Sequence, residues 1–93
     1  MIVTFDELVP LRGRVAMVDG AFDPLHVGHI EYFKAATALG HPLLCNIASD
    51  RYVRDKHPAL LPADQRVAIV DAIRYIVYTH INELDTETVL AQL

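Results

Sequence analysis

Two histidines in the first third of the chain have the residue type and spacing to bind an anion. His26 and His29 lie in the stretch DGAFDPLHVGH at 19–29, which follows a short apolar run and precedes a segment with helical periodicity. Residues three apart project from the same side of a first helical turn, so both imidazoles can donate Nε2–H groups toward one point. Gly28 between them leaves the backbone bare, and Gly20 suits a sharp turn that needs a positive φ. This pattern suits charge developing on a transferring phosphoryl group.

The segments that must position these residues alternate between two kinds. Short apolar runs rich in β-branched residues predict strands, and three- and four-residue apolar spacing predicts helices. The predicted strands are 15–18, 43–48 and 75–79, and the predicted helices are 27–39, 63–74 and 88–92. Ser49 or Asp50 is expected to cap a further short helical turn.

This alternation predicts an α/β fold, a Rossmann-like βαβαβα arrangement with a parallel sheet and right-handed crossovers. Ligands of such a sheet bind outside the carboxyl ends of its strands, where the histidine stretch is expected to lie. We interpret residues 1–93 as a single domain in which residues 1–13 are an N-terminal lead-in.

Composition excludes several classes of protein. The 93 residues are 53% hydrophobic and 22% charged, with a net charge of −4 and one cysteine. These values exclude a disordered segment and a disulfide framework, and they argue against a broad basic surface for nucleic acid. No apolar run is long enough for a membrane span, and the N-terminus lacks a signal-peptide pattern, so we expect a cytoplasmic protein. The high apolar fraction predicts a homodimer through surface around the third strand.

The stretch GAFDPLHVGH at 20–29 resembles the signature of the cytidylyltransferase-like nucleotidyltransferase superfamily. The segments ASDRYV at 48–53, PADQR at 62–66 and IRYI at 73–76 extend the resemblance. Their order is most similar to the glycerol-3-phosphate cytidylyltransferases and to the adenylyltransferase domains that activate heptose 1-phosphate. The resemblance covers nearly the whole chain after Val15.

The resemblance implies transfer of a CMP or AMP group from CTP or ATP to a sugar or polyol phosphate, with release of pyrophosphate. The acceptor phosphate would attack in line, with no covalent enzyme intermediate, and Mg²⁺ would accompany the nucleoside triphosphate. The roles that the resemblance assigns are catalysis for His26, His29 and Lys56, nucleotide binding for Gly20, Ala21, Phe22 and Gly28, and substrate binding for Asp23 and Arg66.

Other interpretations of the same residues stay open. We predict no metal site, although the histidine pair could bind a metal ion with Asp23 or His57 as a third ligand. Lys56 could be a solvated loop lysine, Asp23 a turn former before a proline, and Arg66 a helix-surface residue in a salt bridge.

The resemblance also implies elements that these 93 residues do not match. The family's full domain continues with a further strand and a Ser/Thr-rich helix start that binds the β- and γ-phosphates. We therefore expect a fold truncated at its C-terminal side. The alternative function is a catalytically incomplete nucleotide-binding half-domain that assembles as a dimer.

Overall fold

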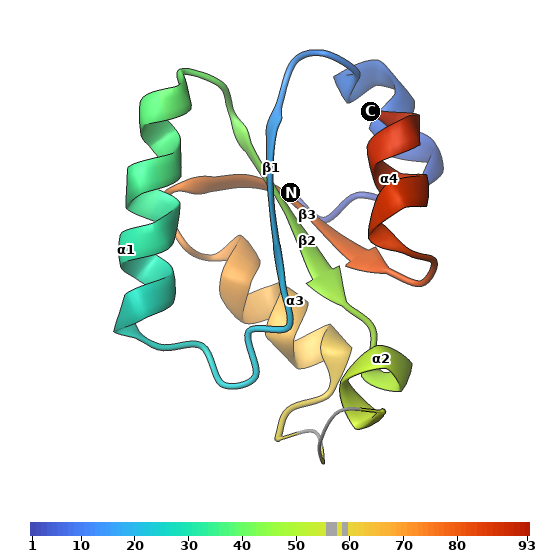
Figure 1. The fold of residues 1–93 in the computed structure, drawn as a ribbon. Coiled ribbons are helices and arrows are strands. Elements are labelled where there is room, and N and C mark those ends of the chain that lie inside the picture. Colours follow the sequence, from blue (N-terminus) through green and yellow to red (C-terminus); the bar gives the residue numbers. More distant parts are fainter. Residues whose placement is uncertain (56–57, 59) are drawn as a thin grey trace.

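The computed structural model describes residues 1–55, 58 and 60–93 (Figure 1). Three strands alternate with helices in the predicted order, and two 3₁₀ helices and one short α-helix are added to them. The elements are η1 (Asp6–Leu11), β1 (Ala16–Gly20), α1 (Val27–Ala36), η2 (Thr37–Leu39), β2 (Leu43–Ala48), α2 (Asp50–Arg54), α3 (Ala63–Asp71), β3 (Ile76–Asn82) and α4 (Thr86–Gln92). Ser49 caps α2, as expected, by accepting a hydrogen bond from the amide of Tyr52.

The three strands form one parallel sheet in the order β1-β2-β3. In the register of the sheet, Val18 of β1 lies beside Cys45 of β2, and Cys45 lies beside Thr79 of β3. The central strand β2 is buried along almost its whole length. Helices cover both of its faces, which is why its sequence is a continuous apolar run rather than an alternating one. The α/β class and parallel topology predicted from the sequence are confirmed.

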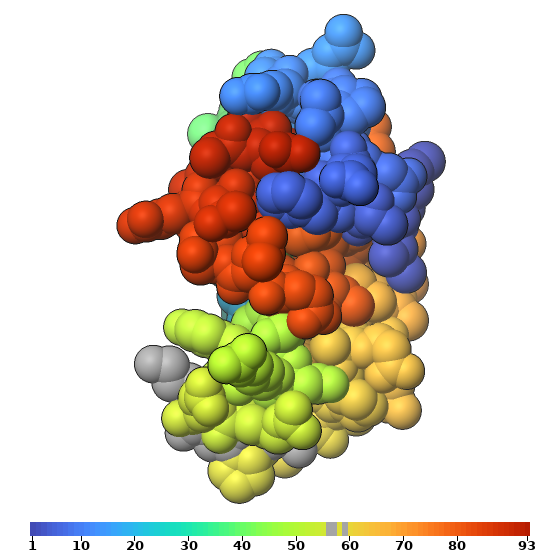
Figure 2. Space-filling model, turned by 90° about the vertical axis from the view of Figure 1, so that its right-hand side faces the viewer, coloured from blue at the N-terminus to red at the C-terminus, as the bar shows by residue number. Residues whose placement is uncertain are grey.

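Each face of the sheet has its own apolar cluster. On one face, Phe33 of α1 and Val67 of α3 pack with Val18 and Ile47. On the other face, Leu8 of η1 and Val89 of α4 pack with Leu44. Figure 1 shows α1 and α3 on one side of the sheet and α4 with the N-terminal segment on the other. Figure 2 shows α4 lying directly against that N-terminal segment.

Several element boundaries differ from the sequence prediction. β1 and β3 each run further than expected, to Gly20 and Asn82, and α3 ends at Asp71 instead of residue 74. The polar residues at the end of β3 look like a loop in the sequence. They continue the strand because the buried ring of His80 is hydrogen-bonded to Asn46 of the neighbouring strand at 2.8 Å. A buried polar group that finds such a partner no longer disfavours a strand.

Residues of the N-terminal segment 1–13, which we expected to be a lead-in, contact the sheet and contribute Val3 and Leu8 to an apolar cluster. Ile2 forms a parallel bridge with Thr79 on the outer edge of β3, and the amide of Val3 donates to the Thr79 carbonyl at 2.8 Å. The terminal amino group also contacts Asp71 at 2.6 Å. The segment was missed because one bridge and a 3₁₀ helix leave no hydrophobic period to detect.

No helix in the part of the chain that the structure describes combines the length and apolar character needed to cross a membrane.

The fold predicts that Leu8→Ala lowers the free energy of unfolding by about 2–5 kcal/mol, because the side chain is fully buried between η1 and the sheet. The matched control is Leu39→Ala, whose side chain is 65% exposed, with an expected change within about 0.5 kcal/mol. Urea unfolding of both variants measures the difference. Equal stability of the two variants would show that the N-terminal segment contributes nothing to the core.

Candidate functional site

The loop after β1 depends on one buried aromatic ring. Phe22 has φ of +52°, a left-handed conformation that is uncommon for a residue other than glycine. Its ring packs against Phe33 and meets the edge of His29, with centroids 5.3 and 5.0 Å apart. A Cβ on Gly20 would lie 2.9 Å from the Phe22 ring, so glycine is required there for space. The positive φ that we expected at Gly20 occurs at Phe22 instead.

His26 and His29 lie together at the N-terminus of α1, as their spacing predicts. His26 is the N-cap, and its Nδ1 accepts the amide of Gly28 at 3.0 Å. The Nδ1 of His29 accepts the amide of His26 at 3.0 Å, and the ring centroids are 4.0 Å apart. Because each Nδ1 is an acceptor, each neutral ring carries its proton on Nε2. The pair therefore presents two Nε2–H donors on the sides of the rings that face away from the backbone.

The local environment keeps His29 neutral at pH 7. Burial lowers the pKa of His29 below the ordinary histidine value, and the positive charge that His26 can carry lowers it further. A depressed pKa means that the folded state favours the neutral ring. The contribution of the neutral ring to folding stability is fully present above the ordinary histidine pKa of about 6.5. It is lost as the pH falls through the lowered pKa of the folded state.

Gly28 serves the same arrangement, although not in the way that its sequence suggests. A Cβ at this position would lie 2.8 Å from the His26 ring. The space above Gly28 is therefore filled by His26 itself, whereas we expected it to be open to a phosphate. Glycine is needed because the ring folds back to reach the Gly28 amide.

Asp23 joins the histidine loop, the segment after β1 that leads to His26 and His29, to the segment before α3. Its two carboxylate oxygens accept the amides of Leu60 and Leu61, at 2.8 and 2.9 Å. Asp23 therefore supports the loop through these two contacts, and its contact with an acceptor stays a prediction. Lys56, the third predicted catalytic residue, lies outside the described residues, and so does His57.

Arg66 is 1% exposed, so its interpretation as a helix-surface residue is wrong, although its salt bridge with Asp50 is present. The guanidinium donates to the carbonyls of Ala21, Ala48 and Leu61 and to the Asp50 carboxylate, at 2.8 to 3.0 Å. These bonds use four of its five N–H groups. The geometry thus makes Arg66 a positioning residue that holds together the ends of two strands, whereas direct contact with substrate stays a prediction.

A cavity of about 440 Å³ opens at the carboxyl ends of all three strands. It is lined by Asp19, Gly20, Ala21, Ala48, Tyr52, Asn82, Leu84, Asp85 and Thr86. A mostly apolar cavity with a few convergent polar groups is typical of a small-molecule site. Of the residues predicted to bind nucleotide, Gly20 and Ala21 line this cavity, while Phe22 is buried under the same loop.

Sequence reasoning missed several residues of this cavity, among them Asp19, Tyr52 and Thr86. A signal was available for Asp19, which directly follows the predicted strand 15–18, at the edge where a parallel sheet binds its ligands. Asp19 is held in place on both sides. It accepts hydrogen bonds from the Asn46 amide at 2.9 Å and from the Thr86 hydroxyl at 3.2 Å.

The described residues provide no third ligand that would let the histidine pair hold a metal ion. Among them, no group of three or more His, Cys, Asp or Glu side chains is placed to hold a metal ion. Asp23, one of the two ligands considered, directs both oxygens at backbone amides.

The chain matches the model of the family described as "Cytidylyltransferase-like" over residues 17–91. It belongs to this family. The match begins in β1 and ends in α4, so it contains the histidine loop and the cavity-lining residues.

Curated relatives and a solved structure are similar to this chain. It is 42% identical over 62 residues to the FAD synthase of Pyrococcus abyssi, a match that covers 64% of this chain and 42% of that protein. The FAD synthase of Archaeoglobus fulgidus is 38% identical over 60 residues, covering 64% of this chain and 44% of its own. The lipopolysaccharide core biosynthesis protein of Thermoplasma volcanium superposes with a TM-score of 0.78 at 26% identity, over 85% of this chain and 66% of that one. The matches thus span less than half of these two FAD synthases and about two thirds of the solved structure.

The two glycines of the histidine loop give a matched pair of variants. We expect Gly20→Ala to lower the free energy of unfolding by about 1–3 kcal/mol, because its methyl group would press on the buried Phe22 ring. Gly28→Ala would instead displace the exposed His26 ring, and alanine favours the helix, so we expect a change below about 1 kcal/mol. Chemical denaturation measures both. A larger loss for Gly28→Ala than for Gly20→Ala would contradict this account of the loop.

Proposed function

We propose that the protein transfers a nucleotidyl group from a nucleoside triphosphate to a phosphate monoester and releases pyrophosphate. The observation that carries this proposal is the pair of backbone-anchored imidazoles at the N-terminus of α1. Two aligned Nε2–H donors and the positive end of a ten-residue helix favour an anion at the same place.

In the proposed reaction, an oxygen of the acceptor phosphate forms a bond to the α-phosphorus. The bond from that phosphorus to the bridging oxygen of pyrophosphate breaks, and pyrophosphate carries away the electron pair. His26 and His29 donate hydrogen bonds to phosphate oxygens on which negative charge increases. Because Nδ1 of each ring is already bonded to the backbone, the donors need no reorganisation during the step. Alignment of the two substrates supplies much of the remaining rate.

The nucleoside is proposed to occupy the cavity at the strand ends. The Asp19 carboxylate, held by Asn46 and Thr86, is placed to accept hydrogen bonds from a sugar hydroxyl. The ring of Tyr52 lines the same cavity and offers a surface on which a base can stack. Arg66 would act indirectly, by fixing the carbonyls of Ala21 and Ala48.

The names of the relatives bear on which substrates to test. A FAD synthase must install an adenylyl group, so the FAD synthase matches favour ATP over CTP as the donor. The neighbour from lipopolysaccharide core biosynthesis keeps sugar and polyol phosphates among the acceptors to be tested. Lys56 is proposed to bind a phosphate of either substrate, and a homodimer remains our proposal for the assembly.

Mg²⁺ enters this proposal as part of the triphosphate substrate, whose charge it neutralises. Oxygen atoms are the ligands that this ion prefers. The Asp85 carboxylate on the cavity wall fits it, because only one of its oxygens is used to cap α4.

We expect His26→Ala to lower kcat about 10²–10³-fold, as loss of a transition-state hydrogen-bond donor does. The measurement is pyrophosphate release from ATP or CTP with FMN, glycerol 3-phosphate and sugar 1-phosphates. His41→Ala is the matched control, because His41 is an exposed histidine just before β2.

Equal turnover by His26→Ala and His41→Ala would contradict the role of the histidine pair. Binding of ATP or CTP by calorimetry, with no pyrophosphate released for any acceptor, would support the half-domain alternative. The incomplete span of the matches to the relatives is the observation that favours testing it.

A further inference from the structure

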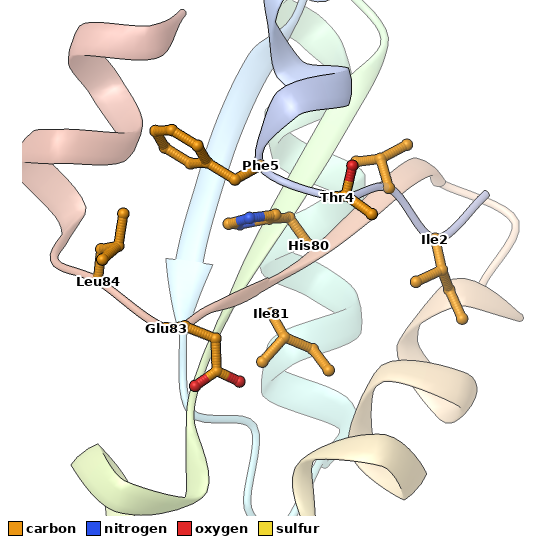
Figure 3. Close-up of a pocket in the computed structure, with 8 residues that line it drawn as sticks. Ile2, Thr4, Phe5, His80, Ile81, Glu83 and Leu84 are labelled. Atoms are coloured by element: carbon orange, nitrogen blue, oxygen red, sulfur yellow. The ribbon is translucent and has the colours of Figure 1, made fainter.

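A second pocket, of about 350 Å³, lies beside the end of β3 (Figure 3). Its wall is formed by residues 2–5 together with His80, Ile81, Glu83 and Leu84, and most of the wall is apolar. Leu84 also lines the cavity at the strand ends, so the loop before α4 borders both spaces. None of the expected site residues that the structure describes lines this pocket.

Three polar side chains in neighbouring positions of the sheet determine which ring nitrogen of His80 carries the proton. Asp19, Asn46 and His80 are register neighbours on β1, β2 and β3. The Asp19 carboxylate only accepts, so Asn46 must turn its amide nitrogen toward it, at 2.9 Å. The amide oxygen of Asn46 then faces Nδ1 of His80 at 2.8 Å, so Nδ1 carries the proton and donates. In the neutral ring, Nε2 is left as a bare acceptor.

This acceptor belongs to a buried ring in the wall of the second pocket. His80 is 4% exposed, and its burial lowers its pKa, which keeps the ring neutral at pH 7. The described residues provide no hydrogen bond to Nε2, and because none of their buried side-chain nitrogens or oxygens lacks a partner, Nε2 reaches solvent through the pocket. The Phe5 ring lies 6.4 Å away, centroid to centroid, and Figure 3 shows the His80 ring pointing toward the space between Phe5 and Leu84. An N–H donor on a ligand can replace water at this acceptor, in a pocket whose other walls are mostly apolar.

We propose that this pocket is a second small-molecule site, for a planar and mostly apolar molecule that donates one N–H hydrogen bond to Nε2 of His80. Phe5 supplies the aromatic wall, and Leu84 separates the ligand from the cavity at the strand ends. The volume of about 350 Å³ is within the range of pockets that hold small ligands. The proposal does not depend on nucleotidyl transfer, because neither His26 nor His29 takes part in it and its pocket lies beside β3.

The test compares two probes that differ only at the donor, indole and 1-methylindole, by NMR titration of the whole chain. We expect indole to bind roughly three- to tenfold more tightly, the effect of one hydrogen bond. We also expect the ¹⁵N resonance of His80 Nε2 to move with indole and not with 1-methylindole. Equal affinities, or shifts that leave residues 2–5 and 80–84 unchanged, would overturn the proposal.

Two variants make the result specific to His80. His80→Phe keeps an aromatic ring but removes the acceptor, so it should bind both probes with equal affinity. Phe5→Leu should weaken both probes while keeping the preference for indole. A retained preference in His80→Phe would show that another group accepts the hydrogen bond, which would contradict the assignment. The wild-type resonance of Nε2 decides the question if His80→Phe does not fold.

Discussion

The guanidinium of Arg66 is buried between segments that are far apart in the sequence, and the site depends on this interaction. It binds the carbonyl that follows β1, the carbonyl at the end of β2 and the carbonyl of Leu61, and it is paired with Asp50. A buried charge is tolerated only when its donors are satisfied, so these oxygens cannot move apart without exposing an unpaired cation. The strand ends that form the cavity are thereby held at fixed separations.

The histidine loop shows how local constraints produce a chemical feature. Phe22 takes a left-handed backbone conformation and packs under the loop, Gly20 gives its ring room, and Gly28 gives room to His26. Gly20, Phe22 and Gly28 thus each have a structural reason for their residue type. The two imidazoles are anchored through Nδ1, so their free Nε2–H donors follow from the fold of the loop and not from a bound ligand.

Much of the fold could be predicted because its strands are short apolar runs and its helices repeat apolar residues every three or four positions. β2 is buried on both faces and was predicted with its observed bounds, whereas the polar end of β3 was cut short because the partner of His80 lies on another strand. The N-terminal segment was missed for a similar reason, since Leu8 becomes a core residue only through contacts with Leu44 and Val89. The high apolar fraction of this small chain is explained by the two apolar clusters, one on each face of the sheet.

The proximity of His26 and His29 could be predicted from their spacing. The burial of Arg66 and the place of Asp19 in a cavity depend on tertiary contacts that no local pattern contains.

In the proposed reaction, two backbone-anchored imidazoles bind the phosphates of a nucleoside triphosphate. Long-range ¹H–¹⁵N correlation spectra of the histidine side chains, recorded above pH 6.5 with and without ATP or CTP and Mg²⁺, test it most directly. We expect His26 and His29 both to carry the proton on Nε2 in the free protein, and both Nε2 resonances to move when the nucleotide binds. A proton on Nδ1 of either ring, or bound nucleotide that leaves both Nε2 resonances unchanged, would contradict it.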